Sequence, residues 1–349
     1  MNRNVDVGIL GATGTVGQEF VRLLESHPWF RVVWLAASER SAGKPYSEAT
    51  RWRLPSDCPS EIATMSVDRC VTGHAPKLVF SGLDSSVAGS VEELFAKNGH
   101  IVVSNAKNFR MESDVPLLIP EINADHLALL ETQTKNRRWS GSIVTNPNCS
   151  TIVMTLALAP LCGFGLRKVV VSTLQAISGA GYPGVASLDI LGNVLPHIPG
   201  EELKIETETQ KILGALTGSE IVPHDVVISA QTTRVPVLNG HTALVSVELA
   251  SNPTVDEVVS AFDSFRGRPQ NENLPTAPSN PVRYVDDPTR PQPRLDVDSE
   301  GGMAITIGRL RECPVLDLKF IVLGHNTVRG AAGAAILNAE LMRVEGLVD

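Results

Sequence analysis

An apolar segment near the start of the chain runs directly into a glycine-rich turn, and this pairing restricts the fold more than any other feature. Residues 5–10 have the length and composition of a buried strand, residues 11–17 read GATGTVG, and residues 18–24 have a helical pattern. Glycines let a backbone approach a pyrophosphate, and the following helix N-terminus offers N–H donors and positive potential. The spacing G-x-x-G-x-x-G differs from the commoner G-x-G-x-x-G, so a tight turn without a ligand remains the alternative to dinucleotide binding.

Strands and helices alternate through residue 150, and the pattern then changes. Alternation of this kind is typical of a parallel, doubly wound sheet, so we expect a Rossmann-like first domain. After residue 165 the expected strands lengthen and intervening helices become fewer, which predicts a second domain of the α+β class. The segments expected to be strands are 31–37, 77–81 and 101–104 in the first part and 168–176, 226–235 and 242–248 in the second.

The last third of the chain gives four further expectations. Residues 256–265 have a helical pattern, and residues 266–299 are rich in proline and polar residues, which predicts a rigid extended excursion. Residues 304–309 and 316–323 read as strands that pair antiparallel, and the alanine-rich segment 334–343 reads as a final helix.

Composition limits the class of protein and its partners. The chain of 349 residues exceeds the usual size of a single core, which favours two domains, and its net charge of -8 argues against nucleic acid or an anionic membrane as the main partner. Residues 1–7 lead straight into a strand and no apolar segment approaches the ~18 residues of a spanning helix, so we expect a cytoplasmic protein. Five cysteines, odd in number and without metal-type spacing, predict reduced thiols and no metal site.

The loop after the second expected strand bears on the choice of dinucleotide. An acidic residue at this place bonds the 2′-hydroxyl of NAD, whereas hydroxyl and guanidinium groups suit the 2′-phosphate of NADP. Glu39 could turn towards a ribose, which keeps NAD as an alternative, and a solvated charged loop is the interpretation without a ligand. The side chains that favour NADP are Ser38, Arg40, Ser41 and Lys44.

A cysteine follows the turn at residues 145–148 and precedes the apolar run 152–158, which places Cys149 in the first turn of an expected helix. The amides and dipole of a helix N-terminus favour an anion, so a thiol there ionises more readily and becomes a better nucleophile. A free cysteine is also among the most buried residue types, and a purely apolar role is the alternative. In a catalytic role, helix amides and Asn148 could stabilise the oxyanion of an attacked carbonyl.

Three more candidates lie at strand ends or in a loop. Ser81 ends an expected parallel strand, where small residues leave room for a ligand. Arg110 follows the strand at 101–104 and is either an ordinary surface arginine or a phosphate clamp at the same sheet edge. The loop at 178–184, SGAGYPG, has backbone freedom and few apolar anchors, so it is a functional lip or a plain linker.

Two pairs of polar residues occur in the second part. Glu201 and Lys204 share one face of an expected helix, an arrangement that is usually a surface ion pair. His241 lies between a glycine and the strand at 242–248, seven residues after Arg234. A histidine in such a place is more often a hydrogen-bonded structural residue than a catalytic one.

Taken together, the ordered motifs GATGTVG, TNPNCST, QAISGAGYPG, GEELK, RVPVLNGH and HNTVRGAAG resemble the aspartate-4-semialdehyde dehydrogenase family, and most closely its fungal and archaeal branch. The resemblance covers nearly the whole chain. It implies a nucleotide domain at 1–149 and 327–349, to which the last helix returns, and a catalytic and dimerisation domain at 150–326. It also implies a homodimer or homotetramer.

By matching motif, the resemblance implies that Cys149 is the nucleophile, His241 the general acid and base, and Gln175 a group that orients the substrate. Arg234 would hold the α-carboxylate of the substrate and Glu201 its amino group. Arg110 and Lys204 would hold phosphate. The residues implied to bind NADP are Gly11, Thr13, Gly14, Thr15, Val16, Ser38, Arg40, Ser41 and Ser81, with Gly181 and Asn326 near the nicotinamide.

The implied reaction is the reduction of aspartyl 4-phosphate to aspartate 4-semialdehyde through a cysteine thioester, with release of inorganic phosphate, in lysine, threonine and methionine biosynthesis. Two other functions stay open: an acyl-thioester reductase similar to malonyl-CoA reductase, and a catalytically silent NADP-binding regulator. Arg329 departs from the expected pattern because it adds a second positive charge near the last turn, and His325 precedes Asn326.

Overall fold

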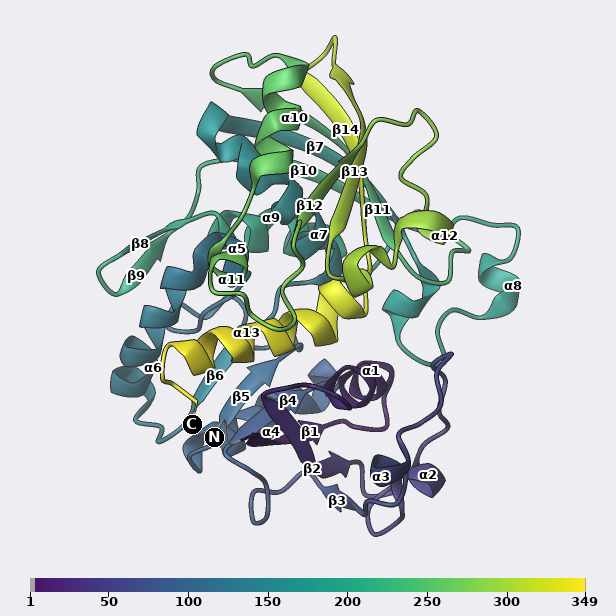
Figure 1. The fold of residues 1–349 in the computed structure, drawn as a ribbon, viewed down its shortest axis with the longest axis vertical. Helices are drawn as coiled ribbons and strands as arrows, with labels where there is room; N and C mark the ends of the chain where they lie inside the picture. The colour runs from purple at the N-terminus through teal and green to yellow at the C-terminus, as the bar shows by residue number, and fades with distance from the viewer. Residues whose placement is uncertain (1–3, 349) are drawn as a thin grey trace.

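The structure, a computed structural model, describes residues 4–348 and contains two six-stranded sheets stacked end to end (Figure 1). The first sheet is parallel throughout, which confirms the predicted doubly wound architecture. Its strands, in spatial order, are β3 (Val67–Arg69), β2 (Phe30–Ala37), β1 (Val5–Leu10), β4 (Leu78–Ser81), β5 (Ile101–Ser104) and β6 (Ser142–Thr145).

Helices cover both faces of the first sheet. The side chains of Val7 and Ile9 pack with α1 and α13 on one face, whereas Leu10 packs with the core around α4 on the other. α4 begins at Ser85, where Asp84 caps it by accepting a hydrogen bond from the backbone N–H of Ser86. The helices of this domain are α1 (Thr15–Leu24), α2 (Tyr46–Ala49), α3 (Ser60–Ala63), α4 (Ser85–Lys97), α5 (Pro120–Asn123), α6 (Leu129–Arg137) and α13 (Gly333–Val344).

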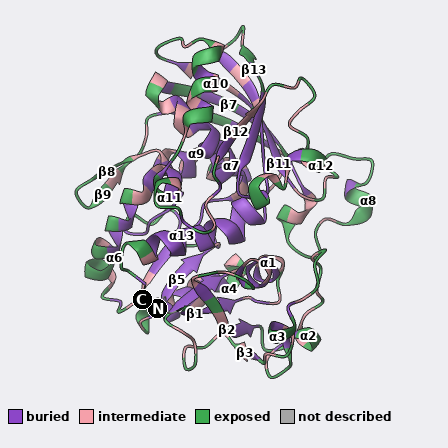
Figure 2. Ribbon diagram, in the orientation of Figure 1, coloured by how far each residue is buried: buried purple, intermediate pink, exposed green. Residues whose placement is uncertain are grey.

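The final helix, α13, crosses the middle of the molecule between the two sheets and is buried along nearly its whole length (Figures 1 and 2). Its alanines allow this close packing on two sides. Its residues 335–342 pack in the core of the first sheet. Residues 328–332 form a π-helical turn ahead of it, which the sequence pattern did not predict.

The second sheet is mixed. β10 runs parallel to β7, while β11 pairs antiparallel with both β7 and β14, and β13 and β14 pair antiparallel as predicted. The apolar face of α7 (Cys149–Leu158) packs on this sheet together with α9 (Glu201–Ile212) and α10 (Val255–Ser264). The strands in spatial order are β10 (Val227–Arg234), β7 (Leu166–Gln175), β11 (His241–Leu249), β14 (Leu318–Gly324), β13 (Ile305–Glu312) and β12 (Val282–Val285).

The extended excursion predicted for residues 266–299 is more structured than expected. β12 lies within it and pairs parallel with β13, and Val282 is buried in the second core, so tertiary pairing turns this segment into an edge strand. The excursion also contains the short helices α11 (Arg268–Asn271) and α12 (Pro293–Asp296). Two further elements lie outside the main sheets: the short helix α8 (Ser187–Ile190) and the hairpin of β8 (Ala215–Thr217) and β9 (Glu220–Val222).

The predicted boundaries at 149/150 and 326/327 fall close to the change from one sheet to the other, and they stay a prediction. Residues 1–3 and 349, which that division includes, lie outside the described residues. Over residues 4–348, no helix combines the length and the apolar character that crossing a membrane requires.

Candidate active site

Cys149 begins α7, as predicted, and is partly exposed. Asn148 caps the helix: its Oδ1 accepts hydrogen bonds from the backbone N–H of Ser150 at 2.9 Å and of Thr151 at 3.2 Å. The close approach of Gly330 restricts the other side, since a Cβ on that residue would lie 2.7 Å from the Cβ of Cys149. The glycine in the RGAAG motif is therefore needed to seat the nucleophile turn against the start of the final helix.

The thiol is protonated at rest, which differs from the expectation of a readily formed thiolate. Burial, and next the carboxylate of Glu201, raise the pKa of Cys149 to about 12, although Arg110, Arg234 and Lys204 lower it. Desolvation and the carboxylate of Glu201 therefore outweigh the three cations. All four charged side chains, one carboxylate and three cations, are close enough to the thiol to change its pKa.

Glu201 and Lys204 form the predicted ion pair, at 2.9 Å, but in the site and not on the open surface. Glu201 is buried, and its second oxygen accepts a hydrogen bond from Nδ2 of Asn148 at 2.7 Å. Asn148 thus has both ends of its amide engaged, one with the helix and one with Glu201. One N–H of its amide remains for an oxyanion.

Arg110 is buried and lies in the site, so the surface interpretation is wrong. Its Nη1 donates to Glu208 at 3.0 Å and its Nη2 donates to the carbonyl of Asn105 at 2.7 Å. Its Nε has no partner within residues 4–348. Glu208 was missed in the sequence, although it repeats the Glu-x-x-Lys spacing of the first pair seven residues later.

His241 and Arg234 lie side by side at the ends of their strands. The backbone N–H of Ala176 donates to Nδ1 of His241 at 3.1 Å. Nη1 of Arg234 donates to the backbone carbonyl of Ala176 at 2.8 Å. A Cβ on Gly179 would lie within 3 Å of both side chains, so only glycine fits between them and the loop.

The ring of His241 is neutral. Burial, and then the positive charge of Arg234, lower its pKa to about 3. Since Nδ1 accepts from a backbone N–H, the proton of the neutral ring is on Nε2, and this buried atom has no partner in the described part of the chain. The histidine therefore presents a free hydrogen-bond donor.

Gln175 ends β7 directly beside Arg234, its partner in the parallel register. It is fully buried, and its Nε2 donates to Oγ1 of Thr173 at 3.3 Å. Its Oε1 finds no donor among residues 4–348. A buried carbonyl oxygen without a donor is able to accept from a substrate N–H, and the orienting role of Gln175 stays a prediction.

The glycine turn has the geometry of an anion site. Gly11 has a φ of +75°, a conformation that favours glycine, and α1 begins at Thr15 without a side-chain cap or an acidic residue in its first turn. Free amides at such a helix start can bind a pyrophosphate. Ser38 and Ser41 form a turn after β2, and the Oγ of Ser81 is buried at the end of β4.

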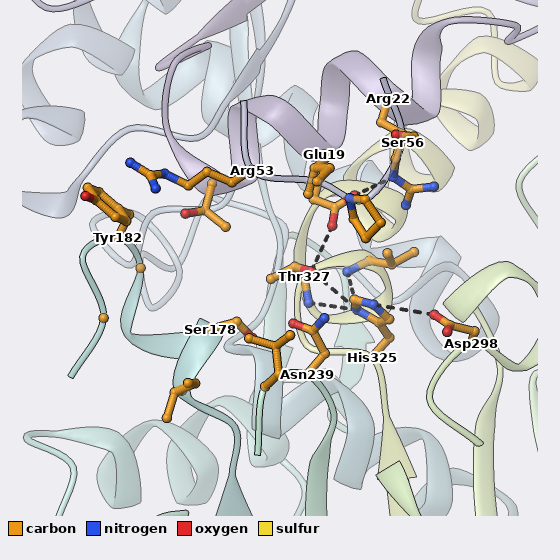
Figure 3. Close-up of a pocket in the computed structure, with 18 of the residues that line it drawn as sticks. Glu19, Arg22, Arg53, Ser56, Ser178, Tyr182, Asn239, Asp298, His325 and Thr327 are labelled. Carbon is orange, nitrogen blue, oxygen red and sulfur yellow. Dashed lines mark hydrogen bonds and ion pairs between the residues drawn. The ribbon is translucent and has the colours of Figure 1, made fainter. Parts of the chain in front are cut away.

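A cleft of about 660 Å³ opens between the two domains (Figure 3). It is bordered by α1, by residues 53–56 and by residues 177–185, and Thr15 and Gly181 are among the residues that line it. Asn326 does not line the cleft but holds the loop, because its Nδ2 donates to Oγ of Ser178 at 2.8 Å and its Oδ1 accepts from the N–H of Gly240 at 2.8 Å. The sequence reasoning missed Glu19, which lines the cleft and contacts Thr327.

Arg329 does not add a charge to the site. Its guanidinium is fully buried and forms two hydrogen bonds of 2.7 Å with the carboxylate of Glu121. The second positive charge expected near the last turn is therefore neutralised inside the protein. His325 lines the cleft, where its Nδ1 accepts hydrogen bonds from the N–H groups of Thr327 and Val328.

A parallel nucleotide-binding sheet, an interdomain cleft and a cysteine among three cations define the class of nicotinamide-dependent dehydrogenases that work through a thiol. Residues 6–130 match the family model described as "Semialdehyde dehydrogenase, NAD binding domain", and residues 158–329 match "Semialdehyde dehydrogenase, dimerisation domain". The chain belongs to the aspartate-semialdehyde dehydrogenase family.

Relatives and solved structures agree with this assignment over nearly the full length. The chain is 50% identical to the aspartate-semialdehyde dehydrogenase of Archaeoglobus fulgidus, covering 98% of this chain and 99% of the other. It is 48% identical to that of Schizosaccharomyces pombe, with the same coverage. It superposes on the crystal structure of the Candida albicans enzyme with NADP with a TM-score of 0.91 at 40% identity, covering 99% of this chain and 100% of that one. The predicted resemblance to archaeal and fungal members is confirmed.

Proposed function

We propose that the protein reduces aspartyl 4-phosphate to aspartate 4-semialdehyde with NADP as the cofactor, through a thioester on Cys149. The observation that carries the proposal is the charge pattern around the thiol: three cations, Arg110, Arg234 and Lys204, and one carboxylate, Glu201. The proposed substrate has a phosphate, an α-carboxylate and an ammonium group. Its charges are thus complementary to those of the site.

Each charged group has a partner in this proposal. Arg234 is buried, so a bond to the α-carboxylate would form in a water-poor environment where it is strong. Glu201 would accept from the α-ammonium through lone pairs that its two present bonds leave free. Arg110 and Lys204 would bind the phosphate.

The substrate itself would help to activate the nucleophile. The carboxylate of Glu201 raises the pKa of the Cys149 thiol, so an ammonium group bound to Glu201 would offset that effect. The thiol proton would pass to Nε2 of His241 once the ring carries its own proton on Nδ1 in place of the bond from Ala176. The thiolate would then attack the carbonyl carbon, the bond to the phosphate oxygen would break, and the phosphate would leave towards Arg110 and take up a proton from solvent. Amides at the start of α7 and the remaining N–H of Asn148 would stabilise the oxyanion.

The reduced cofactor, NADPH, would supply the hydride that reduces the thioester. His241, protonated by the thiol in the first step, would return its Nε2 proton to the resulting oxyanion. Collapse of the thiohemiacetal, in which the hydroxyl proton passes back to sulfur, would release the aldehyde and the thiol. In the reverse direction the same ring would act as the base. For that step too the ring would carry its proton on Nδ1 in place of the bond from Ala176, which frees Nε2 to accept a proton.

The glycine turn and the loop after β2 are suited to NADP. The uncapped start of α1 would bind the pyrophosphate, and Arg40 with the hydroxyls of Ser38 and Ser41 would bind the 2′-phosphate. The Candida albicans relative with NADP supports this choice. NAD remains the alternative because Glu39 lies in the same loop.

We also propose that the protein forms a homodimer through the open face of the second sheet, with a homotetramer as the larger alternative. Val170, Leu174, Val227 and Leu244 project from this face and are 39–62% exposed. Adjacent apolar side chains on a sheet face favour burial against a partner. The match of residues 158–329 to a dimerisation domain supports a dimer formed by this part of the chain.

The test is phosphate-dependent reduction of NADP⁺ with aspartate semialdehyde, run beside Cys149→Ala. We expect activity from the natural sequence and none from the variant. If the natural sequence is inactive there but oxidises NADPH with malonyl-CoA, the acyl-thioester reductase is correct, although such a substrate has no amino group for Glu201. If neither activity is found and no thiol is protected by substrate, the silent regulator is correct.

A further inference from the structure

Helix α9 carries the spacing Glu-x-x-Lys twice, seven residues apart. The first pair is Glu201 and Lys204, and the second is Glu208 and Lys211. Because each residue turns by about 100°, all four lie in one stripe about 80° wide along the helix. Glu208 and Lys211 are only 2% and 6% exposed, and charged side chains are rarely so buried unless they are paired. The proposed reaction gives this second pair no role.

Glu208 connects two parts of the site with one carboxylate. Its Oε1 accepts from Nη1 of Arg110 at 3.0 Å, and its Oε2 accepts from the backbone N–H of Asn148 at 2.6 Å. Arg110 comes from the first domain, and Asn148 immediately precedes the nucleophile. The carboxylate therefore fixes the distance between the guanidinium and the turn that carries Cys149.

Lys211 holds the segment around Arg110 from the other side. Its ammonium donates to the carbonyls of Arg110 at 2.7 Å, of Glu112 at 2.7 Å and of Val115 at 2.9 Å. An ammonium has three donors, so all of them are used on this one segment. The loop cannot shift relative to α9 without breaking several buried hydrogen bonds.

The cofactor side of the molecule is joined differently. There the guanidinium of Arg53 stacks on the ring of Tyr182 across one end of the cleft, 3.2 Å from its centroid, and Tyr182 is 61% exposed (Figure 3). An exposed stacking contact of this kind is weaker than a buried network of charge-assisted hydrogen bonds. The two domains are thus held firmly at α9 and more loosely at the cleft.

We propose that Glu208 and Lys211 are positioning residues that fix Arg110 relative to Cys149, so that the phosphate-binding half of the site is formed before the substrate binds. The inference rests on the proposed function for the role of Arg110 in binding phosphate. The carboxylate of Glu208 has a second effect, because it offsets the positive charge of Arg110 close to the thiol.

The first test is Glu208→Gln, with Glu206→Gln as the matched control. Glu206 is on the same helix, and its carboxylate accepts from the backbone N–H of Ala230. The side chain of the glutamine keeps one oxygen that can accept a hydrogen bond. Its NH₂ group, however, faces either Arg110 or the backbone N–H of Asn148, and both of these are donors. We expect the KM for phosphate to rise at least about tenfold while the KM for NADP is unchanged. The control is expected to match the natural sequence in both.

The second readout is the pH profile of Cys149 alkylation by iodoacetamide, which needs no turnover. Arg110 lowers the pKa of the thiol, so loss of the offsetting carboxylate should move the profile to lower pH. Simple loosening of the fold would not strengthen the field at the thiol. Glu208→Asp keeps the charge but is one methylene shorter, so it should raise the KM for phosphate and leave the thiol profile nearly unchanged.

The outcomes separate the two proposals. If the natural sequence lacks phosphate-dependent activity, the proposed function fails, and the alkylation profile still decides whether Glu208 acts on the site. If Glu208→Gln does not fold, Glu208→Asp decides through the KM for phosphate. A phosphate KM within twofold of the natural value in the folded variant, or an equal rise in the KM values for phosphate and NADP, overturns the positioning role.

Discussion

Glu92 on α4 is a buried carboxyl whose ionisation should set how stability depends on pH. It is fully buried, and its Oε1 accepts from Oγ of Ser104 at 2.7 Å, while its Oε2 has no partner in the described residues. Burial raises its pKa from 4.5 to about 7, although Ser81, Ser104 and Arg110 act in the opposite direction. The native protein therefore holds a proton on Glu92 at a pH where the unfolded chain has released it.

This difference destabilises the protein as the pH rises. Between pH 4.5 and about 7 the native state binds more protons than the unfolded state, so the free energy of unfolding falls and stays low above that range. This rise of the Glu92 pKa from 4.5 to about 7 lowers the free energy of unfolding by about 3 kcal/mol in total. Between pH 5 and pH 8 the loss is about 2.5 kcal/mol, because part of it has already occurred at pH 5.

The substitution Glu92→Gln removes the titration and keeps the shape. Its amide oxygen can accept from Ser104, and its N–H groups can donate to the hydroxyl of Ser81, which has no partner among residues 4–348. At each pH we subtract the thermal midpoint of the natural sequence from that of the variant. We expect this difference to be about 3 °C larger at pH 8 than at pH 5, from an unfolding entropy of roughly 2 cal/mol/K per residue.

The assay is thermal unfolding followed by circular dichroism at both pH values, with Glu93→Gln as the control. Glu93 is the next residue on the same helix and forms an exposed pair with Lys97, so its substitution should shift the midpoint little and equally at both pH values. If the difference between Glu92→Gln and the natural sequence is the same at pH 5 and pH 8, Glu92 does not titrate in this interval and the reasoning is refuted.

Three further predictions concern single side chains. Arg329→Met should lower the free energy of unfolding by about 3–5 kcal/mol in denaturant titration, because it leaves the carboxylate of Glu121 buried and unpaired, and adding Glu121→Leu should recover much of the loss. Arg234→Leu should raise the KM for aspartate semialdehyde with unchanged NADP affinity by fluorescence titration; an equal loss of both would mean a structural role. Burial lowers the pKa of His241 to about 3, so the native ring stays neutral while the ring in the unfolded chain gains a proton below pH 6.5. The free energy of unfolding should therefore fall on acidification, and it should fall less in His241→Asn.

Local patterns predicted much of the fold. The strand, glycine turn and helix at the start of the chain are confirmed because the turn geometry depends on residues adjacent in sequence. β12 was missed because its pairing with β13 is what makes the segment a strand. The π-helical turn at 328–332 was missed for a similar reason: it follows from seating Gly330 against Cys149, which is a contact between distant segments.

Residue types and motif order also identified most of the candidate site, but not its electrostatics. The motifs placed Cys149 at a helix start and predicted the pairing of Glu201 with Lys204. They could not show that burial raises the pKa of the thiol in spite of three nearby cations, because desolvation depends on the packing of both domains. Glu208 was overlooked because a single glutamate on a helix has no meaning until its two hydrogen-bond partners are known.

The role of Glu201 joins reactivity to substrate recognition and can be tested apart from turnover. Its carboxylate is the main charge that raises the pKa of the Cys149 thiol, and it is also the proposed partner of the substrate ammonium. Glu201→Gln should therefore make Cys149 react faster with iodoacetamide at pH 8, while raising the KM for aspartate semialdehyde. Its neighbour Glu202, which accepts from the backbone N–H of Thr232, provides the control as Glu202→Gln. An unchanged alkylation profile in Glu201→Gln would mean that burial alone holds the thiol protonated, and that the substrate ammonium has no part in activating the nucleophile.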